Sequence, residues 1–345
     1  MIAMRPRARL IYNPTSGNEG MRRYVADILD VLEQAGYEAS AFQTTAEPFS
    51  AKKEASRATE AGFALIVGAG GDGTINEVVN GIAPHKHRPK MALIPAGTTN
   101  DYARALRIPR DDPVAAAKVI LKGQTLRMDI GQANSHYFMN IAAGGLLTEL
   151  TYQVPSEFKS IFGYFAYVVK AAEMLPAIQS VPMHLEYDDG VYDGPASMFL
   201  LAMTNSVGGF EQIVPDSSMG DGKFSLIVVK TGNFGDMLVL IAKVLNGGRH
   251  VDDSNIIYTK TSKLVATRKD GGEMKINLDG DYGGSAPMTF VNLKQHIEMF
   301  ANVDEIPKKN LDIDLVRQQG YLEEVENISH QDLNGDGQIA SGDDK

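Results

Sequence analysis

The 345-residue sequence predicts an α/β protein with two domains, an N-terminal parallel sheet covered by helices and a β-rich second domain packed as a sandwich. Three observations support this prediction. Strand and helix patterns alternate up to about residue 125, short β-rich runs divided by turns follow Arg127, and the length exceeds what one compact core usually fills. We expect residues 1–126 with about 290–327 to form the first domain, 127–289 the second, and 328–345 an acidic tail.

The first elements follow from hydrophobic patterning. The short apolar run "ARLIYNP" (8–14) predicts a buried strand. Residues 20–37 carry apolar side chains at helical spacing and reach a glycine stop at Gly36, so they predict an amphipathic helix. Residues 37–45 alternate as a strand does, and residues 50–61 are typical of a second helix.

Two further strands lead into glycine-rich turns. The segment "FALIVGAGGDGT" (63–74) predicts a strand entering such a turn, with a helix over "INEVVNGIA" (75–83). The segment "KMALIPAGTTND" (90–101) repeats this arrangement, with a helix from Asn100, and a further helix is expected over 112–123. This alternation is typical of a parallel sheet with helices on both faces.

Composition restricts the class of partner. Residues 1–127 contain 17 Lys and Arg against 13 Asp and Glu, so a basic first domain lies within a chain of net charge −10 and suits an anionic ligand. Nucleic acid is not expected, because no Lys/Arg stripe is interleaved with aromatics. The sequence has no cysteine, and it has no apolar stretch near the roughly 18 residues of a transmembrane helix. We expect a cytoplasmic protein that is at most peripherally associated with a membrane.

Three predicted strand ends carry glycine-rich loops, "NPTSG" (13–17), "GGDGT" (70–74) and "PAGTT" (95–99). Ligands of open parallel sheets bind beyond these ends, where glycine lets backbone N–H groups approach phosphate oxygens beside a helix N-terminus. One such turn could equally be structural, but three in succession predict a phosphate site. Asp72 would repel phosphates, which indicates a bridging divalent metal as in phosphoryl transfer.

The motif "GGDGTINEVVNG" (70–81), preceded by "NPTSG" and followed by "PAGTTNDYARAL" (95–106), resembles the diacylglycerol kinase catalytic domain. Over roughly 1–303 the chain is similar to soluble bacterial diacylglycerol kinases, through "SSMGDGK" (217–223) and "NLDGDYGG" (277–284). The resemblance implies a nucleotide domain of the NAD kinase and phosphofructokinase type and an ATP-dependent lipid kinase that forms phosphatidic acid. A kinase of another lipid (a sphingoid base or ceramide) or of NAD, and a non-catalytic nucleotide- or lipid-binding relative, remain alternatives.

The resemblance assigns cofactors to individual residues. ATP is expected over Asn13, Pro14, Thr15, Ser16, Gly17, Thr44, Gly71, Asp72, Gly73, Thr74, Ile75, Asn76, Glu77 and Thr98. Mg²⁺ is expected at the side chain of Asp221 and the carbonyls of Ser218 and Lys223, although by itself this segment is an ordinary Gly-Asp-Gly turn.

The catalytic residues implied by the resemblance are Asp72, which helps to organise the metal, and Asp281. Relatives use the Glu of an Asp-Gly-Glu triplet as general base on the lipid hydroxyl, and this chain has Asp279-Gly280-Asp281. The Asp281 carboxylate is therefore one methylene shorter than in that pattern. A second departure is Asn18, where related kinases can carry Lys.

Two segments bear on partners. Residues 158–175 mix aromatics with lysines and could meet a lipid substrate at the membrane surface, but we favour a core helix. The tail "DLNGDGQIASGD", from Asp332 to Asp343, fits the ligand positions of a calcium loop, and a flexible acidic tail is favoured over a weak Ca²⁺ site. The sequence leaves open whether the protein is a homodimer.

Overall fold

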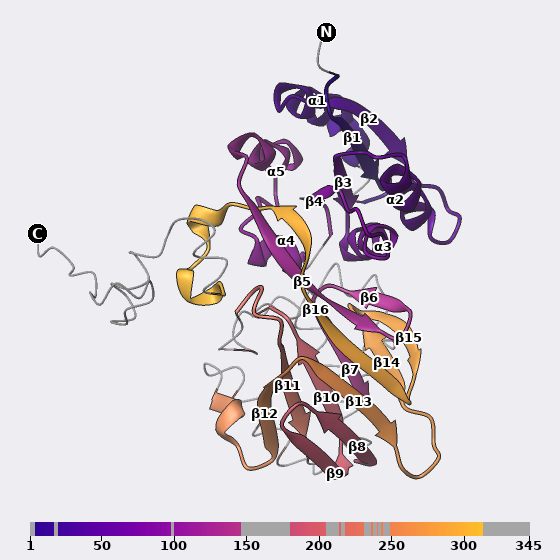
Figure 1. Cartoon of the computed structure of the whole chain (residues 1–345), viewed down its shortest axis with the longest axis vertical. Helices are drawn as coiled ribbons and strands as arrows, with labels where there is room; N and C mark the ends of the chain where they lie inside the picture. The colour runs from indigo at the N-terminus through magenta and orange to yellow at the C-terminus, as the bar shows by residue number, and fades with distance from the viewer. Residues whose placement is uncertain are drawn as a thin grey trace, which may run out of the picture.

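The computed structural model describes residues 4–16, 20–97, 100–145, 180–204, 214, 218–230, 236, 240, 243 and 249–312. These residues form two lobes, with the N-terminal strands and helices in the upper lobe of Figure 1 and antiparallel strands in the lower one. The architecture confirms the predicted fold class. None of the helices in these ranges is long and apolar enough to span a membrane.

The upper lobe contains four parallel strands in the order β2-β1-β3-β4. They are β1 (Arg7–Tyr12), β2 (Glu38–Gln43), β3 (Leu65–Gly70) and β4 (Lys90–Pro95). The helices are α1 (Met21–Gln34), α2 (Ser50–Glu60), α3 (Asp72–Ile82), α4 (Asp101–Ala105) and α5 (Pro113–Lys118), followed by the 3-10 turn η1 (Val119–Lys122). Each lies where the sequence predicts an element. All six residues of β3 are buried, as expected for a central parallel strand.

The remaining strands pair antiparallel with one another. They are β5 (Thr125–Ala133), β6 (His136–Phe138), β7 (Ile141–Gly145), β8 (Val181–Tyr187), β9 (Gly190–Ala196), β10 (Met198–Ala202), β11 (Phe224–Val229), β12 (Ile256–Thr261), β13 (Lys263–Arg268), β14 (Lys275–Leu278), β15 (Asp281–Ser285) and β16 (Met288–Phe300). The short 3-10 turns are η3 (Arg249–Asp252), η4 (Val303–Glu305) and η5 (Lys308–Asn310). A six-stranded sheet, β12-β11-β10-β7-β14-β15, packs in this lobe against the antiparallel part of a ten-stranded sheet.

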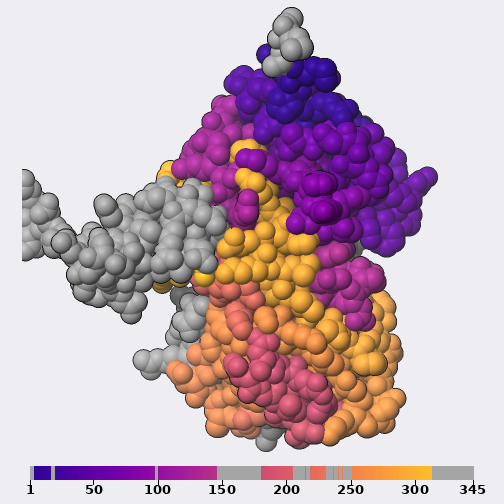
Figure 2. Space-filling model, viewed as in Figure 1, coloured from indigo at the N-terminus to yellow at the C-terminus, as the bar shows by residue number. Residues whose placement is uncertain are grey.

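The long strand β16 joins the two lobes into one sheet. It runs parallel to β4 at Met299 and antiparallel to β13 and β5. Figure 2 shows its yellow-orange residues between the purple upper lobe and the lower lobe. Strand β5 contributes to both hydrophobic cores, since Ile130 packs in the core of the upper lobe and Ala133 in that of the lower lobe. A bulge between Leu293 and Ile297 interrupts β16 at this level. The lobes thus share backbone hydrogen bonds as well as chain connections.

Candidate active site

The three glycine-rich loops meet at one edge of the parallel sheet. Strands β1, β3 and β4 are neighbours, so their carboxyl ends lie side by side. The N–H of Asn13 donates to the carbonyl of Ala69 at 2.9 Å, and the N–H of Ala96 donates to that of Gly70 at 2.8 Å. The side-chain amide of Asn13 also reaches the Thr74 hydroxyl at 3.4 Å. The structure therefore brings together the loops that the sequence predicts as a phosphate site.

The second and third loops pack directly on each other. A Cβ added at Gly97 would lie 3.0 Å from the Cα of Gly71 and 2.8 Å from Oδ1 of Asn100, so a side chain at position 97 would displace these neighbours. Asn100 adopts a left-handed conformation (φ 47°), and its amide side chain bonds both the N–H and the carbonyl of Gly97. Its backbone N–H donates to Oδ2 of Asp72 at 3.2 Å. The neighbouring loop thus helps to orient the Asp72 carboxylate.

Asp72 is the first residue of α3, and the first turn of this helix has open space beside it at Gly73. Gly71 at the N-cap position is extended, and no side-chain hydrogen bond caps this helix end among the described residues. A Cβ at Gly73 would meet nothing within 4 Å. An uncapped helix N-terminus with open space beside it is suited to bind an anion through its backbone N–H groups.

Three predicted nucleotide residues have side chains that contact protein instead. Ile75 is buried in the upper core. Asn76 donates through Nδ2 to Oδ2 of Asp279 at 2.8 Å. Glu77 accepts through Oε2 from the N–H groups of Ala51 (3.0 Å) and Lys52 (3.4 Å), at the start of α2. Their part in nucleotide binding stays a prediction, and these side chains hold the first turn of α3 and the adjoining helix in place.

The remaining predicted nucleotide residues lie on the same edge. Thr15 donates through its N–H and its hydroxyl to Oδ1 of Asn13, which closes the first loop as a turn. The N–H of Thr44 donates to the carbonyl of Tyr12 at 2.9 Å, so the end of β2 adjoins that loop. Pro14 and Ser16 lie within it, whereas Gly17, Asn18, Thr98, the segment 158–175 and the tail 332–343 lie outside the described residues.

Asp279 is a residue whose hydrogen bonds the sequence analysis did not predict. Asp279 is partly buried, and burial raises the pKa of its carboxyl although its hydrogen bonds act in the opposite direction. Besides Asn76, it accepts from the backbone N–H groups of Met139 (2.6 Å), Asn140 (2.8 Å) and Ile141 (2.9 Å). Asp279 (φ 51°) and Gly280 (φ 100°) both have left-handed backbones, and the exposed Asp281 then begins β15. The Asp-Gly pair indicates a turn, but nothing local indicates that its first carboxylate points inward.

The predicted metal loop carries a carboxylate that is already paired. Asp221 accepts from the N–H of Lys223 at 2.8 Å through Oδ1 and from the ammonium of Lys260 at 2.9 Å through Oδ2. Carboxylate and carbonyl oxygens are ligands that suit Mg²⁺, so the chemistry of Asp221 with the Ser218 and Lys223 carbonyls fits the ion. In the part of the chain described here no three His, Cys, Asp or Glu side chains cluster as a metal site, so the loop offers one carboxylate, shared with Lys260.

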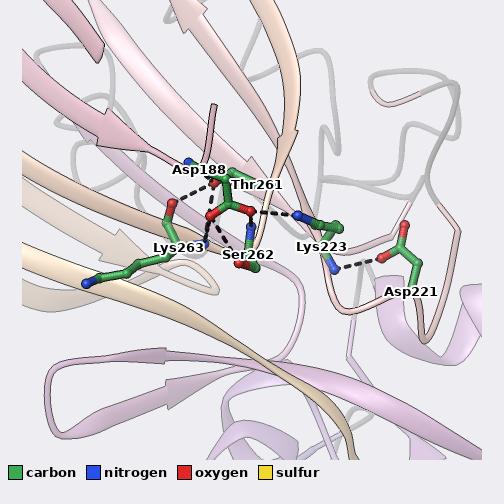
Figure 3. A network of polar contacts seen from close by, with 6 residues as sticks. All are labelled: Asp188, Asp221, Lys223, Thr261, Ser262 and Lys263. Atoms are coloured by element: carbon green, nitrogen blue, oxygen red, sulfur yellow. Dashed lines mark hydrogen bonds and ion pairs between the residues drawn. The ribbon is translucent and has the colours of Figure 1, made fainter. Parts of the chain in front are cut away.

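A network fixes this loop to the turn between β8 and β9 (Figure 3). The Lys223 ammonium donates to Oδ2 of Asp188 at 2.6 Å, and the N–H groups of Ser262 and Lys263 donate to the same carboxylate. Partial burial opposes ionisation, but these donors together hold the pKa of Asp188 well below its usual range. The loop is therefore positioned by ionic contacts within the protein.

Asp129 is a second residue that sequence analysis missed. Its Oδ2 accepts from the N–H of Gly222 and its Oδ1 from the N–H of Gln295, both at 2.7 Å. Burial raises the pKa of Asp129 to about 6, although these two N–H groups favour the ionised form. Gln295 lies in the bulge of β16 with a left-handed backbone (φ 51°). Asp129 thus connects the predicted metal loop to the strand shared by the two lobes.

Comparisons with known proteins agree with this geometry. Residues 7–133 match the family model described as the diacylglycerol kinase catalytic domain, and residues 150–301 match the YegS C-terminal NAD kinase beta sandwich-like domain. A diacylglycerol kinase of Bacillus subtilis (strain 168) is 48% identical over 293 residues, which cover 85% of this chain and 95% of that protein. A diacylglycerol kinase of Staphylococcus haemolyticus (strain JCSC1435) is 46% identical, covering 93% and 96%. The chain belongs to the diacylglycerol kinase family.

Solved structures support this assignment. A crystal structure of a Bacillus anthracis (strain Sterne) protein superposes with a TM-score of 0.74 at 27% identity, covering 86% of this chain and 98% of that one. A diacylglycerol kinase structure from the same strain has a TM-score of 0.66 at 24% identity and covers 86% and 97%, which shows a shared fold. The glycine loops of the upper lobe thus lie in a kinase catalytic domain, and the lower lobe is the β sandwich-like domain of the family.

Proposed function

We propose that this family member is an ATP-dependent diacylglycerol kinase. The free hydroxyl oxygen of diacylglycerol bonds to the γ-phosphorus, the bond from that phosphorus to the bridging oxygen breaks, and the products are phosphatidic acid and ADP. Relatives named for this activity support the proposal. The observation that carries it is the junction of three glycine-rich loops at the uncapped N-terminus of α3, with Asp72 beside them.

In this proposal the two lobes bind different substrates. Residues 1–126 with about 290–327 bind nucleotide, whose phosphates are held by the backbone of the first loop and of Gly71 to Thr74. Residues 127–289 receive the lipid. Asp281 accepts the hydroxyl proton as general base, and its place at the exposed start of β15 leaves the carboxylate accessible to substrate.

The oxygen donors of this chain can also hold Mg²⁺. The ion would supply positive charge beside the transferred phosphoryl group and in the second-lobe loop. Asp72 lies within the second glycine-rich loop and would be the carboxylate beside an ion at the phosphates. Asp221, with the Ser218 and Lys223 carbonyls, would bind an ion only if the Lys260 ammonium moves away from Oδ2 of Asp221. We expect the protein to be cytoplasmic and to bind membranes peripherally during turnover, because its substrate is a membrane lipid.

A panel of acceptors with γ-labelled ATP tests the proposal. The purified chain is given diacylglycerol in vesicles, sphingosine, ceramide and NAD in separate reactions, with and without Mg²⁺. Label is expected in phosphatidic acid and only with the metal present. Label confined to NADP or to a sphingolipid would overturn the substrate assignment. No label in any acceptor, from a protein that still binds ATP, would identify a non-catalytic binding relative.

A further inference from the structure

One face of α3 is bonded to the lower lobe. Asn76 and Asn80 are four residues apart, so their side chains lie on the same face of the helix. Asn80 donates to the carbonyl of Tyr137 at 2.8 Å and accepts from the N–H of Tyr137 at 3.0 Å. Asn80 also donates to Oδ1 of Asn76 at 2.9 Å, and Asn76 in turn donates to Asp279. We call these four residues, Asn76, Asn80, Tyr137 and Asp279, the interlobe latch.

The other side of the latch is held by several backbone hydrogen bonds. Asp279 accepts three backbone N–H groups from the turn between β6 and β7, and its own N–H donates to the carbonyl of Ile141 at 3.0 Å. The N–H of Gly280 donates to Oδ1 of Asn277 at 2.9 Å. The chain from Asp279 to the start of β15 is therefore held from both directions. Asp281 is the second residue after this anchor.

The latch has a consequence for catalysis, because its two sides carry the two predicted catalytic residues. Asp72 lies one helical turn before Asn76 on α3, about 5–6 Å away. A displacement on the order of 1 Å between reacting groups can cost about 10²-fold in rate. We propose that Asp279 is a positioning residue, which through the latch sets the Asp281 carboxylate relative to the phosphate loops. This inference rests on the proposed kinase function.

The Asp279→Asn variant tests the inference. It keeps the shape of the side chain but turns one acceptor oxygen into an NH₂ group that faces other donors. We expect kcat to fall about 10²-fold while the KM for ATP changes less than about threefold, because the nucleotide loops are intact. In the double variant Asn76→Asp/Asp279→Asn, donor and acceptor exchange sides. We expect kcat to recover about tenfold over Asp279→Asn, incompletely because the Met139 N–H still lacks its acceptor.

Two further variants keep the test decisive. Asn76→Ala removes the bond from α3 to Asp279 but leaves Asn80 bonded to Tyr137. It serves if Asp279→Asn does not fold, with an expected loss in kcat of about tenfold. Glu54→Gln is the matched control, a buried carboxylate on α2 that is bonded to Arg9 and Arg57 and should lower Tm without changing kcat. Wild-type kcat in folded Asp279→Asn or Asn76→Ala, or no recovery in the double variant, would overturn the positioning role.

The acceptor used in this comparison is whichever compound the wild-type chain phosphorylates. Failure of diacylglycerol as a substrate would therefore contradict the proposed function while the comparison of variants proceeds with another acceptor. If no acceptor is phosphorylated at all, the positioning role is overturned together with the kinase function.

Discussion

The same tripeptide, Gly-Asp-Gly, builds two different sites in this protein. Residues 71–73 follow the buried strand β3 and enter helix α3, with Asp72 near open space and backbone donors. Residues 220–222 form a tight turn in which both glycines have left-handed backbones (φ 82° and 77°), and Asp221 is paired with Lys260. The flanking structure therefore decides whether such a carboxylate lies beside open space and backbone donors or pairs with another side chain.

Removing Asp72 should have the largest effect. Asp72→Ala is expected to lower kcat by at least about 10³-fold with little change in Tm, because the proposed role of this carboxylate is in phosphoryl transfer and not in apolar packing. Asp112→Ala is the matched control at another helix start. Asp112 caps α5 through the N–H groups of Val114 and Ala115, so its loss should cost about 1 kcal/mol of stability and leave kcat unchanged. An active, folded Asp72→Ala would remove Asp72 from the mechanism.

The next largest effect is expected at Asp281, which follows the turn of Asp279 and Gly280. Asp281→Asn should lower kcat by about 10²- to 10⁴-fold, the usual range for loss of a general base. If the turn has adapted to the shorter side chain, Asp281→Glu will be neutral or slower, and this is the outcome we expect. A faster Asp281→Glu enzyme would show that the turn is not adapted. Steady-state kinetics on both variants decide between these outcomes, and full activity of Asp281→Asn would exclude Asp281 as the base.

Changing the pairing of Asp221 should have a moderate effect on the Mg²⁺ requirement. Asp221→Ala is expected to raise the Mg²⁺ concentration for half-maximal activity by about tenfold, because one carboxylate ligand is lost. Lys260→Met should lower that concentration, since the ammonium no longer competes for Oδ2. The control Lys269→Met removes a surface lysine paired with Asp193. Identical Mg²⁺ titrations of all four proteins would mean that this loop is a turn and no metal site.

The smallest effect is expected in the pH dependence of stability contributed by Asp188, which is bonded to the loop that carries Asp221. The pKa of Asp188 is lowered in the folded protein, so its contribution to stability is complete above its unfolded pKa of about 3.9 and is lost as pH falls through the folded value. At pH 7 Asp188→Asn should lower Tm by a few degrees. The difference in Tm between wild type and variant should shrink progressively below about pH 4. A constant difference from pH 7 to pH 3 would contradict the role of the ionised carboxylate.

Local sequence was sufficient for most of the upper lobe and for the phosphate loops. The period of apolar residues marks α1 and β3, glycine marks the turn before α3, and Asn100 marks the start of α4, because these depend on neighbours in the chain. Three adjacent parallel strands necessarily end at one edge, so the meeting of the loops could also be predicted.

Tertiary structure alone decided how the two lobes are joined. Asp279 meets Asn76 across 203 positions and the β6–β7 turn across about 140, and Asp129 meets Gln295 across 166. Asp129 is buried and Asp279 is partly buried, and a charge withdrawn from water must be satisfied by donors from wherever the fold supplies them. No short-range pattern records such partners, since a hydrogen bond depends on distance in space and not along the chain. The sequence therefore determined the elements and the glycine-rich loops, whereas packing decided which aspartates hold the lobes together.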